Sequence, residues 1–239
     1  MTTPRPTVAR RDHHRALQQV FAASVPCAPG ARVLDVAAGE GGLATLLEAR
    51  GARLVGLERA AARCAAGRER GQSVVRGDAA RLPFADASFD WAILRHALHH
   101  VEHEREALAE LARVACAGLV VAEPWREAAW PEQRAAADYD AWLARQQRRI
   151  GRHHGDAVPP ERIVAWLDEL GDFAIATTRH APRVVLAPAE IEAQIEEASW
   201  DLPRDDPERA ALAALRPALG HHGVGATGTA IVVARRLAR

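Results

Sequence analysis

The chain has 239 residues, of which 49% are hydrophobic and 26% are charged, a composition typical of a globular protein with room for one large α/β domain. Its 31 basic residues balance its 31 acidic ones, so no overall electric field would recruit nucleic acid or anionic lipid. With no secretory signal, no apolar run of about 20 residues and three widely spaced cysteines, the sequence predicts a cytoplasmic protein without a membrane partner or a structural metal.

The first half of the chain alternates short apolar strands with helices. After an N-terminal helical segment within residues 1–30, the apolar runs predict strands at 32–36, 53–57, 73–76, 90–94 and 118–122. The helical stretches between them cover residues 43–50, 60–70 and 100–113. Strands that are apolar on both faces are typical of a parallel sheet covered by helices on both sides. The predicted fold class is therefore α/β, a Rossmann-like doubly wound and mostly parallel sheet that binds its ligand at the carboxyl ends of the strands.

The pattern changes after residue 123. Residues 125–150 and 161–170 are typical of helices, and two further strands are expected at 172–178 and 229–234. A long stretch separates those two strands, with one helix expected at 190–200 and another at 207–215.

We expect a single domain over residues 1–239, with its core at 31–123. The segments 124–160 and 181–225 are too long to be simple connections, because loops beyond about 15 residues are usually functional or disordered. They hold four of the six tryptophans and the only tyrosine of the chain, which favours ordered lids over a substrate.

A glycine-rich loop follows the first strand of the core. The strand ends at Asp35, and Gly39, Gly41 and Gly42 come directly after it. Glycine allows the backbone to approach a ligand and to turn sharply into a helix whose first amides face the crevice. Two alternatives remain open for this loop alone. It could be a tight turn without a ligand, and its spacing also satisfies the nicotinamide-dinucleotide fingerprint.

Acidic residues also end the next two strands. Glu58 lies 19 residues after Gly39, the spacing at which a carboxylate meets the hydroxyls of a ribose. Asp78 and Ala79 follow the third strand, where a carboxylate and a backbone amide can read an adenine ring. The alternatives are a solvated strand-end glutamate and an aspartate that caps a turn.

Together with the segments Leu82-Pro-Phe-Ala-Asp-Ala-Ser-Phe-Asp90 and Leu98-His-His100, these elements closely resemble class I S-adenosylmethionine-dependent methyltransferases. The resemblance is strongest to the broad type that includes quinone-biosynthesis C-methyltransferases, and it covers residues 31–124. It implies a seven-stranded sheet, S-adenosylmethionine as cofactor and transfer of its methyl group to a small-molecule acceptor.

The resemblance also implies a cofactor site at the ends of the first four strands. The residues at the matching positions are Asp35, Ala37, Gly39, Gly41, Glu58, Arg59, Asp78, Ala79 and Arg95.

Within this set, Glu58 would bind the ribose, Asp78 and Ala79 the adenine, and Arg95 would lie near the methionine part of the cofactor. Two positions depart from the family. Ala37 stands where glycine is common, and Arg95 replaces a smaller residue. Arg95 could read an acidic group on the substrate or form a structural ion pair.

Four histidines, His96, His99, His100 and His103, have helical spacing, which allows either a metal site or a general base. We expect no metal, because two of them belong to the family's Leu-His-His motif. Our candidates for a general base are His100 and Glu123, the latter at the end of the fifth strand.

Trp125, Tyr139 and Trp142, in the first lid segment, are the candidate wall for an apolar or aromatic acceptor, against an alternative of ordinary core packing. Two other functions stay open. The chain could use bound S-adenosylmethionine for chemistry other than methylation, or it could be a catalytically silent cofactor-binding subunit.

Overall fold

The computed structural model describes residues 8–39, 41–181, 184–186, 192, 195–196, 202–222 and 224–238. Its contacts divide the chain into two compact units. The first, here called the sheet unit, comprises Gln18–Pro124, Ala157–Arg179 and Ala230–Arg239. The second, here called the helical unit, comprises Met1–Leu17, Trp125–Asp156 and His180–Thr229.

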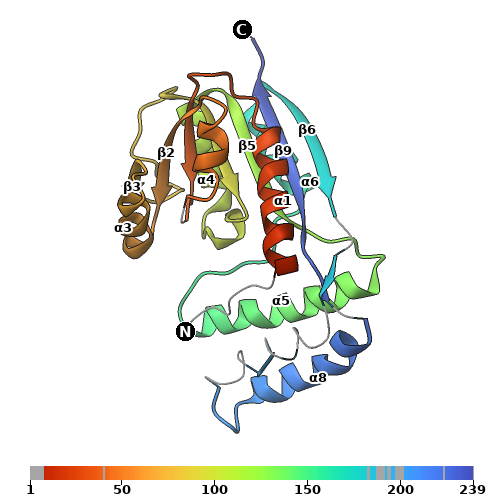
Figure 1. The fold of residues 1–239 in the computed structure, drawn as a ribbon. Helices are drawn as coiled ribbons and strands as arrows, with labels where there is room; N and C mark the ends of the chain where they lie inside the picture. Colours follow the sequence, from red (N-terminus) through yellow and green to blue (C-terminus); the bar gives the residue numbers. More distant parts are fainter. Residues whose placement is uncertain are drawn as a thin grey trace. The chain divides into compact units, whose positions relative to one another are not determined.

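The sheet has seven strands in the described part of the chain, in the order β3-β2-β1-β4-β5-β9-β6 (Figure 1). Their bounds are β1 Arg32–Val36, β2 Arg53–Glu58, β3 Val74–Arg76, β4 Phe89–Arg95, β5 Ala115–Trp125, β6 Phe173–His180 and β9 Gly228–Arg236. Strand β1 pairs in parallel with β2 and β4, β2 with β3, and β4 with β5. The predicted doubly wound, mostly parallel sheet is confirmed.

Helices cover both faces of this sheet because side chains along each strand alternate between the faces. The helices that contribute to the sheet unit are α1 Val8–Ser24, α2 Ala44–Glu48, α3 Ala61–Glu69, α4 Glu104–Val114 and α6 Pro160–Leu170. On one face, Val33, Ile93 and Val120 share a buried cluster with Phe21 of α1 and Leu47 of α2.

On the opposite face, the next residue of each strand belongs to a second buried cluster. Leu34, Leu94 and Val121 pack there with Leu108 of α4 and Leu167 of α6. All five side chains are fully buried, so the central strands are apolar on both faces, as the sequence predicts for a parallel sheet.

The helix expected at 100–113 begins later than predicted. Leu98–His100 form a separate 3-10 turn, η1, and the backbone is extended at Val101 before α4 begins at Glu104. His96 moreover has a positive φ of 50°. The four histidines of this region therefore do not share one helix, and the helical spacing inferred for them is wrong.

In the described part of the helical unit, helices α5 Pro131–Arg149 and α8 Pro207–His222 contact each other (Figure 1). Short strands β7 Val185–Leu186 and β8 Val224–Gly225 pair antiparallel and were not predicted. Helix α8 extends well past the expected end at residue 215, although Pro217 lies within it.

Most of both predicted lid segments belongs to this unit, but Pro124 and residues 157–160 lie in the sheet unit. Most of the helix expected at 190–200 falls outside the described residues. Among the described helices, none combines the length and the apolar character that a bilayer crossing requires. The cytoplasmic location stays a prediction.

Candidate functional site

Four charged residues lie at or near the carboxyl ends of neighbouring parallel strands of the sheet unit. Asp35 lies near the end of β1, Glu58 ends β2, Arg95 ends β4 and Glu123 lies near the end of β5. Because these strands run parallel, their carboxyl ends share one edge of the sheet. The four residues therefore lie at one edge of the sheet, and their roles in binding stay predictions.

The loop after β1 is tied to the end of β2 through Glu58. The amide of Gly39 donates to Oε2 of Glu58 at 3.1 Å, and the amide of Ala60 donates to Oε1 at 2.8 Å. Glu58 is 6% exposed. A buried carboxylate that holds the glycine loop is in reach of whatever the loop cradles, so Glu58 and Gly39 belong to one site.

The loop adopts a left-handed backbone that favours glycine. The φ angle is +58° at both Ala37 and Gly39, and +75° at Gly41. At Gly41 a Cβ atom would lie only 1.9–2.2 Å from the side-chain amide of Gln72, whose Nε2 donates to the Gly41 carbonyl at 3.1 Å. Gln72 therefore supports the loop, a contact that no sequence motif indicated.

Asp35 and Arg95 lie on the same face of the sheet. Asp35 pairs in register with Ile93, and Arg95 is two residues further along β4, so both side chains point to the face covered by α1 and α2. Burial raises the pKa of Asp35 to about 7, although the charge of Arg95 opposes this rise and that of Glu58 adds to it. Asp35 thus carries only part of a negative charge at neutral pH.

The guanidinium of Arg95 is left with unsatisfied polar atoms. Its Nε and Nη1 are buried and have no hydrogen-bond partner in the described part of the chain. Burial lowers the pKa of Arg95, and the nearby Asp35 counteracts this effect. Orphaned buried donors of this kind indicate a site for an anionic group. The edge therefore fits a cofactor that presents both a ribose and a carboxylate.

The residues after β3 and β2 are less buried. Asp78 is exposed, and its Oδ1 accepts a hydrogen bond from the amide of Ala80 at 2.9 Å, while Ala79 is 8% exposed. Arg59 is exposed and its carbonyl accepts a hydrogen bond from Nε of Arg76 at 3.2 Å. Asp78 makes the turn that the alternative interpretation describes, and the adenine-binding role of this segment stays a prediction.

Glu123 lies on the other face of the sheet and is fully buried. Its Oε1 accepts a hydrogen bond from the amide of Leu98 at 3.1 Å. Its Oε2 lies 2.8 Å from Nδ1 of His99 and 3.2 Å from the amide of Val158. Both carboxylate oxygens take part in these contacts, and one of them contacts the imidazole of His99.

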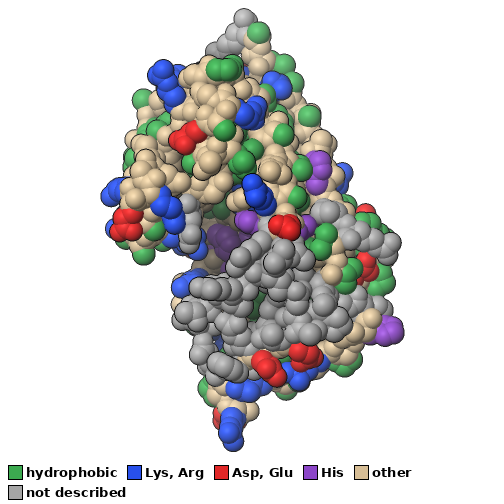
Figure 2. Space-filling model, in the orientation of Figure 1, with side chains coloured by type: hydrophobic (Ala, Val, Ile, Leu, Met, Phe, Trp, Pro, Cys, Tyr) green, Lys and Arg blue, Asp and Glu red, His purple; other side chains and the backbone are tan. Residues whose placement is uncertain are grey.

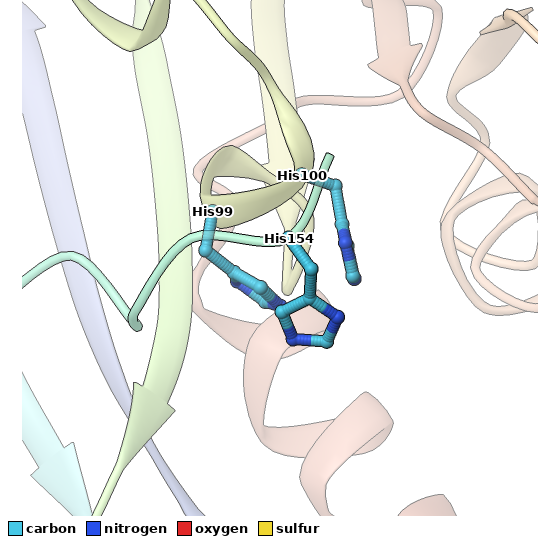
Figure 3. Close-up of side chains that lie close together, drawn as sticks. All are labelled: His99, His100 and His154. Carbon is cyan, nitrogen blue, oxygen red and sulfur yellow. The ribbon is translucent and has the colours of Figure 1, made fainter. Parts of the chain in front are cut away.

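His99 was not among the residues predicted for the site, whereas its neighbour His100 was. His99 is buried and His100 exposed, and their rings lie side by side with centroids 4.1 Å apart (Figure 3). The signal that could have identified His99 is the pairing of the Leu-His-His motif with an acidic residue at the end of the next strand. The general-base role of His100 and Glu123 stays a prediction.

The predicted acceptor wall lies in the helical unit. Tyr139 and Trp142 are 7% and 1% exposed, and their rings are nearly parallel at 6.1 Å. Nε1 of Trp142 donates to the carbonyl of Glu208 at 3.1 Å, which ties α5 to α8. Core packing alone explains both positions. Trp125, at the end of β5, is half-buried, and the substrate role of all three stays a prediction.

Acidic and basic side chains are interspersed over the face drawn in Figure 2. Among the coloured side chains of that face, this mixture is in line with the balanced composition.

Comparison with known proteins identifies a family and several relatives of this chain. Residues 34–121 match the family described as "Methyltransferase domain". The demethylmenaquinone methyltransferase of Mycobacterium sp. (strain KMS) is 36% identical over 173 residues, which cover 69% of this chain and 74% of the relative. That of Renibacterium salmoninarum is 38% identical over 113 residues, covering 46% of this chain and 48% of the relative.

Solved structures share the fold. The YcgJ protein from Bacillus subtilis superposes with a TM-score of 0.67 at 17% identity, covering 95% of this chain and 100% of that one. The [4+2]-cyclase SpnF superposes with a TM-score of 0.62 at 23% identity, covering 94% and 82%. At such identities the likeness establishes the fold and nothing more specific.

Proposed function

This chain belongs to the class I S-adenosylmethionine-dependent methyltransferases, and we propose that its acceptor is a small apolar quinol related to demethylmenaquinone. The similarity to demethylmenaquinone methyltransferases over 173 residues is the observation that carries the proposal. The balanced charge, together with the four tryptophans and one tyrosine of the lid segments, is in keeping with an uncharged, flat acceptor.

We propose that the cofactor binds at the edge built by Asp35, Gly39, Glu58 and Arg95. Glu58 would accept hydrogen bonds from the ribose hydroxyls, since its carboxylate already holds the glycine loop. The orphaned Nε and Nη1 of Arg95 would bind the carboxylate of the methionine part. When bound, S-adenosylmethionine supplies an activated methyl group, so the enzyme's own task is to position the acceptor and to exclude water.

We further propose that segments 124–160 and 181–225 recognise the acceptor. The first of these segments follows directly on Glu123, at the same strand end as the proposed cofactor site. Strand-end loops of doubly wound sheets are where such folds recognise their ligands.

The test uses the purified full chain with deuterium-labelled S-adenosylmethionine and a demethylmenaquinone of short side chain, kept reduced by dithionite. The expected result is a quinone heavier by the labelled methyl group, formed in equal amount with S-adenosylhomocysteine. The oxidised quinone and an assay without enzyme are the controls. Conversion of the quinol without S-adenosylhomocysteine would favour chemistry other than methylation. No methylated product at saturating cofactor and acceptor would overturn the proposed acceptor.

A further inference from the structure

The sheet unit holds a carboxylate and an imidazole in direct contact at the strand ends. Oε2 of Glu123 lies 2.8 Å from Nδ1 of His99. The side chain of Glu123 is 1% exposed and that of His99 is 9% exposed. The carboxylate is therefore more deeply buried than the imidazole that it contacts.

The contacts of Glu123 fix the orientation of the ring. Because a carboxylate only accepts hydrogen bonds, Nδ1 of His99 must be the protonated nitrogen of the neutral ring, and Nε2 is then the basic one. The amides of Leu98 and Val158 hold the same carboxylate in place from two other segments. Such a carboxylate also stabilises the imidazolium that forms when Nε2 takes up a proton.

Methylation of a quinol at a ring carbon requires this kind of proton acceptor. The neutral quinol is a weak carbon nucleophile. Loss of its hydroxyl proton makes the ring carbon next to that oxygen electron-rich. General-base catalysis of such a step typically contributes about 10²–10⁴ in rate.

We infer that His99 is the general base of the reaction and that Glu123 is its positioning residue, an inference that rests on the proposed quinol acceptor. His99 removes the hydroxyl proton, and the electron pair released to the ring carbon forms the new C–C bond with the methyl group. The methyl–sulfur bond breaks and its electron pair returns to sulfur. The ring carbon then loses its hydrogen as a proton, and the imidazolium reprotonates the oxygen. One proton is released overall.

This assignment differs from the one that the sequence alone suggested. His100 is adjacent to His99 but exposed, and Glu123 has both oxygens committed to other groups. Glu123 therefore acts through His99 and not on the acceptor itself.

The decisive variant is His99→Asn, whose side-chain amide can still donate to Glu123 but carries no basic nitrogen. We expect its kcat with the reduced demethylmenaquinone to fall at least 100-fold. The KM for the acceptor and the affinity for S-adenosylhomocysteine should stay within threefold of the wild type. The matched control is His14→Asn, at an exposed histidine of α1, for which we expect a change in kcat of less than threefold.

A second acceptor separates a base from a structural residue. A chlorine on the unsubstituted ring of the naphthoquinol makes its hydroxyl more acidic, so it needs less help in losing the proton. The deficit of His99→Asn should shrink at least tenfold with this acceptor. An equal deficit with both acceptors, or a larger loss in His100→Asn, would overturn the inference.

One measurement does not depend on turnover. In ¹⁵N-labelled wild-type protein at a pH where His99 is neutral, its ring should show the tautomer protonated at Nδ1, and in Glu123→Gln this preference should be lost. An Nε2-protonated ring in the wild type would overturn the dyad. A wild type that shows the Nδ1 tautomer but methylates no quinol would instead contradict the proposed acceptor.

Discussion

The amide of Gly39 donates a hydrogen bond to Oε2 of Glu58 at 3.1 Å, although 19 residues separate the two in sequence. The other oxygen of the same carboxylate accepts from the amide of Ala60. One buried side chain thus joins the loop after β1 to the loop after β2, and it does so with the acceptor atoms proposed to face a ribose.

Replacement of Glu58 by Gln should weaken cofactor binding. Glutamine presents a donor where one of the two backbone amides needs an acceptor, so one hydrogen bond is lost and the loop loosens. We expect the affinity for S-adenosylhomocysteine, measured by calorimetry, to fall by about 1.5–3 kcal/mol, the range for hydrogen bonds to charged groups. Exposed Glu48 of α2 provides the control, since Glu48→Gln should leave the affinity unchanged. Equal affinities in the wild type and Glu58→Gln would remove Glu58 from the site.

Replacement of Ala37 by Gly should stabilise the protein slightly. Ala37 has a φ of +58°, a conformation that costs an L-residue roughly 1–2 kcal/mol in the folded state. Glycine removes this cost but has more freedom in the unfolded chain, which lowers the stability by roughly 0.5–1 kcal/mol. We expect the free energy of unfolding to rise by about 0.5 kcal/mol in urea titrations. Ala87→Gly, also at positive φ, should behave alike, whereas Ala60→Gly, at φ −77°, should destabilise. A loss of stability in Ala37→Gly would show that the alanine methyl makes a compensating contact.

Arg95→Met should discriminate between ligands with and without a carboxylate. The variant keeps an unbranched apolar stem but removes the buried donors Nε and Nη1. We expect affinity for S-adenosylhomocysteine to fall by about 1.5–3 kcal/mol, the range for charge-assisted hydrogen bonds. Binding of 5′-methylthioadenosine, which lacks the amino-acid part, should change by less than threefold. Equal losses for both ligands would show that Arg95 acts elsewhere, for example on the acceptor.

The sequence predicted the sheet well because its strands are short, apolar on both faces and separated by helices, so their order follows from local patterns. The sequence spacing also placed Gly39 and Glu58 at the same edge, but it did not predict the hydrogen bond between them. The contact of Glu123 with Val158 was not predictable, because Val158 lies 35 residues away and nothing in the surrounding sequence marks it. The break after His100 was missed for a different reason: the sequence pattern allowed a continuous helix, and the extended backbone at Val101 is set by tertiary structure.

Asp35 should make the stability of the protein depend on pH. Its pKa rises from an ordinary 3.8 to about 7 on folding, chiefly through burial, so the folded state binds the proton more tightly than the unfolded state. Stability from this group is therefore present in full below about pH 4 and is lost as pH rises to about 7. At about 1.36 kcal/mol per pH unit, the loss amounts to up to about 4 kcal/mol.

Asp35→Asn isolates this effect, because the variant cannot ionise at that position while all other groups remain. We expect the free energy of unfolding of the wild type, relative to Asp35→Asn, to fall between pH 4 and pH 7 and to be constant above pH 8. Urea titrations at pH 4.5, 6 and 8 measure the difference. A difference that stays constant, or that rises with pH, would show that Arg95 holds Asp35 ionised in the folded state.

Half-buried Trp125, the final residue of β5, provides a test of the role proposed for segment 124–160. If segment 124–160 recognises an apolar acceptor, removal of the indole should raise the acceptor KM or lower kcat without touching the ribose and carboxylate contacts. We expect kcat/KM for the reduced demethylmenaquinone to fall at least tenfold in Trp125→Ala, a loss of about 1.4 kcal/mol or more in transition-state stabilisation. Affinity for S-adenosylhomocysteine should stay within twofold.

Trp166→Ala is the matched control, because this half-buried tryptophan of α6 lies outside both lid segments and contacts the Arg162 guanidinium. If Trp166→Ala lowered kcat/KM as much as Trp125→Ala, the loss would reflect general weakening of the fold, and the acceptor role of this segment would be contradicted.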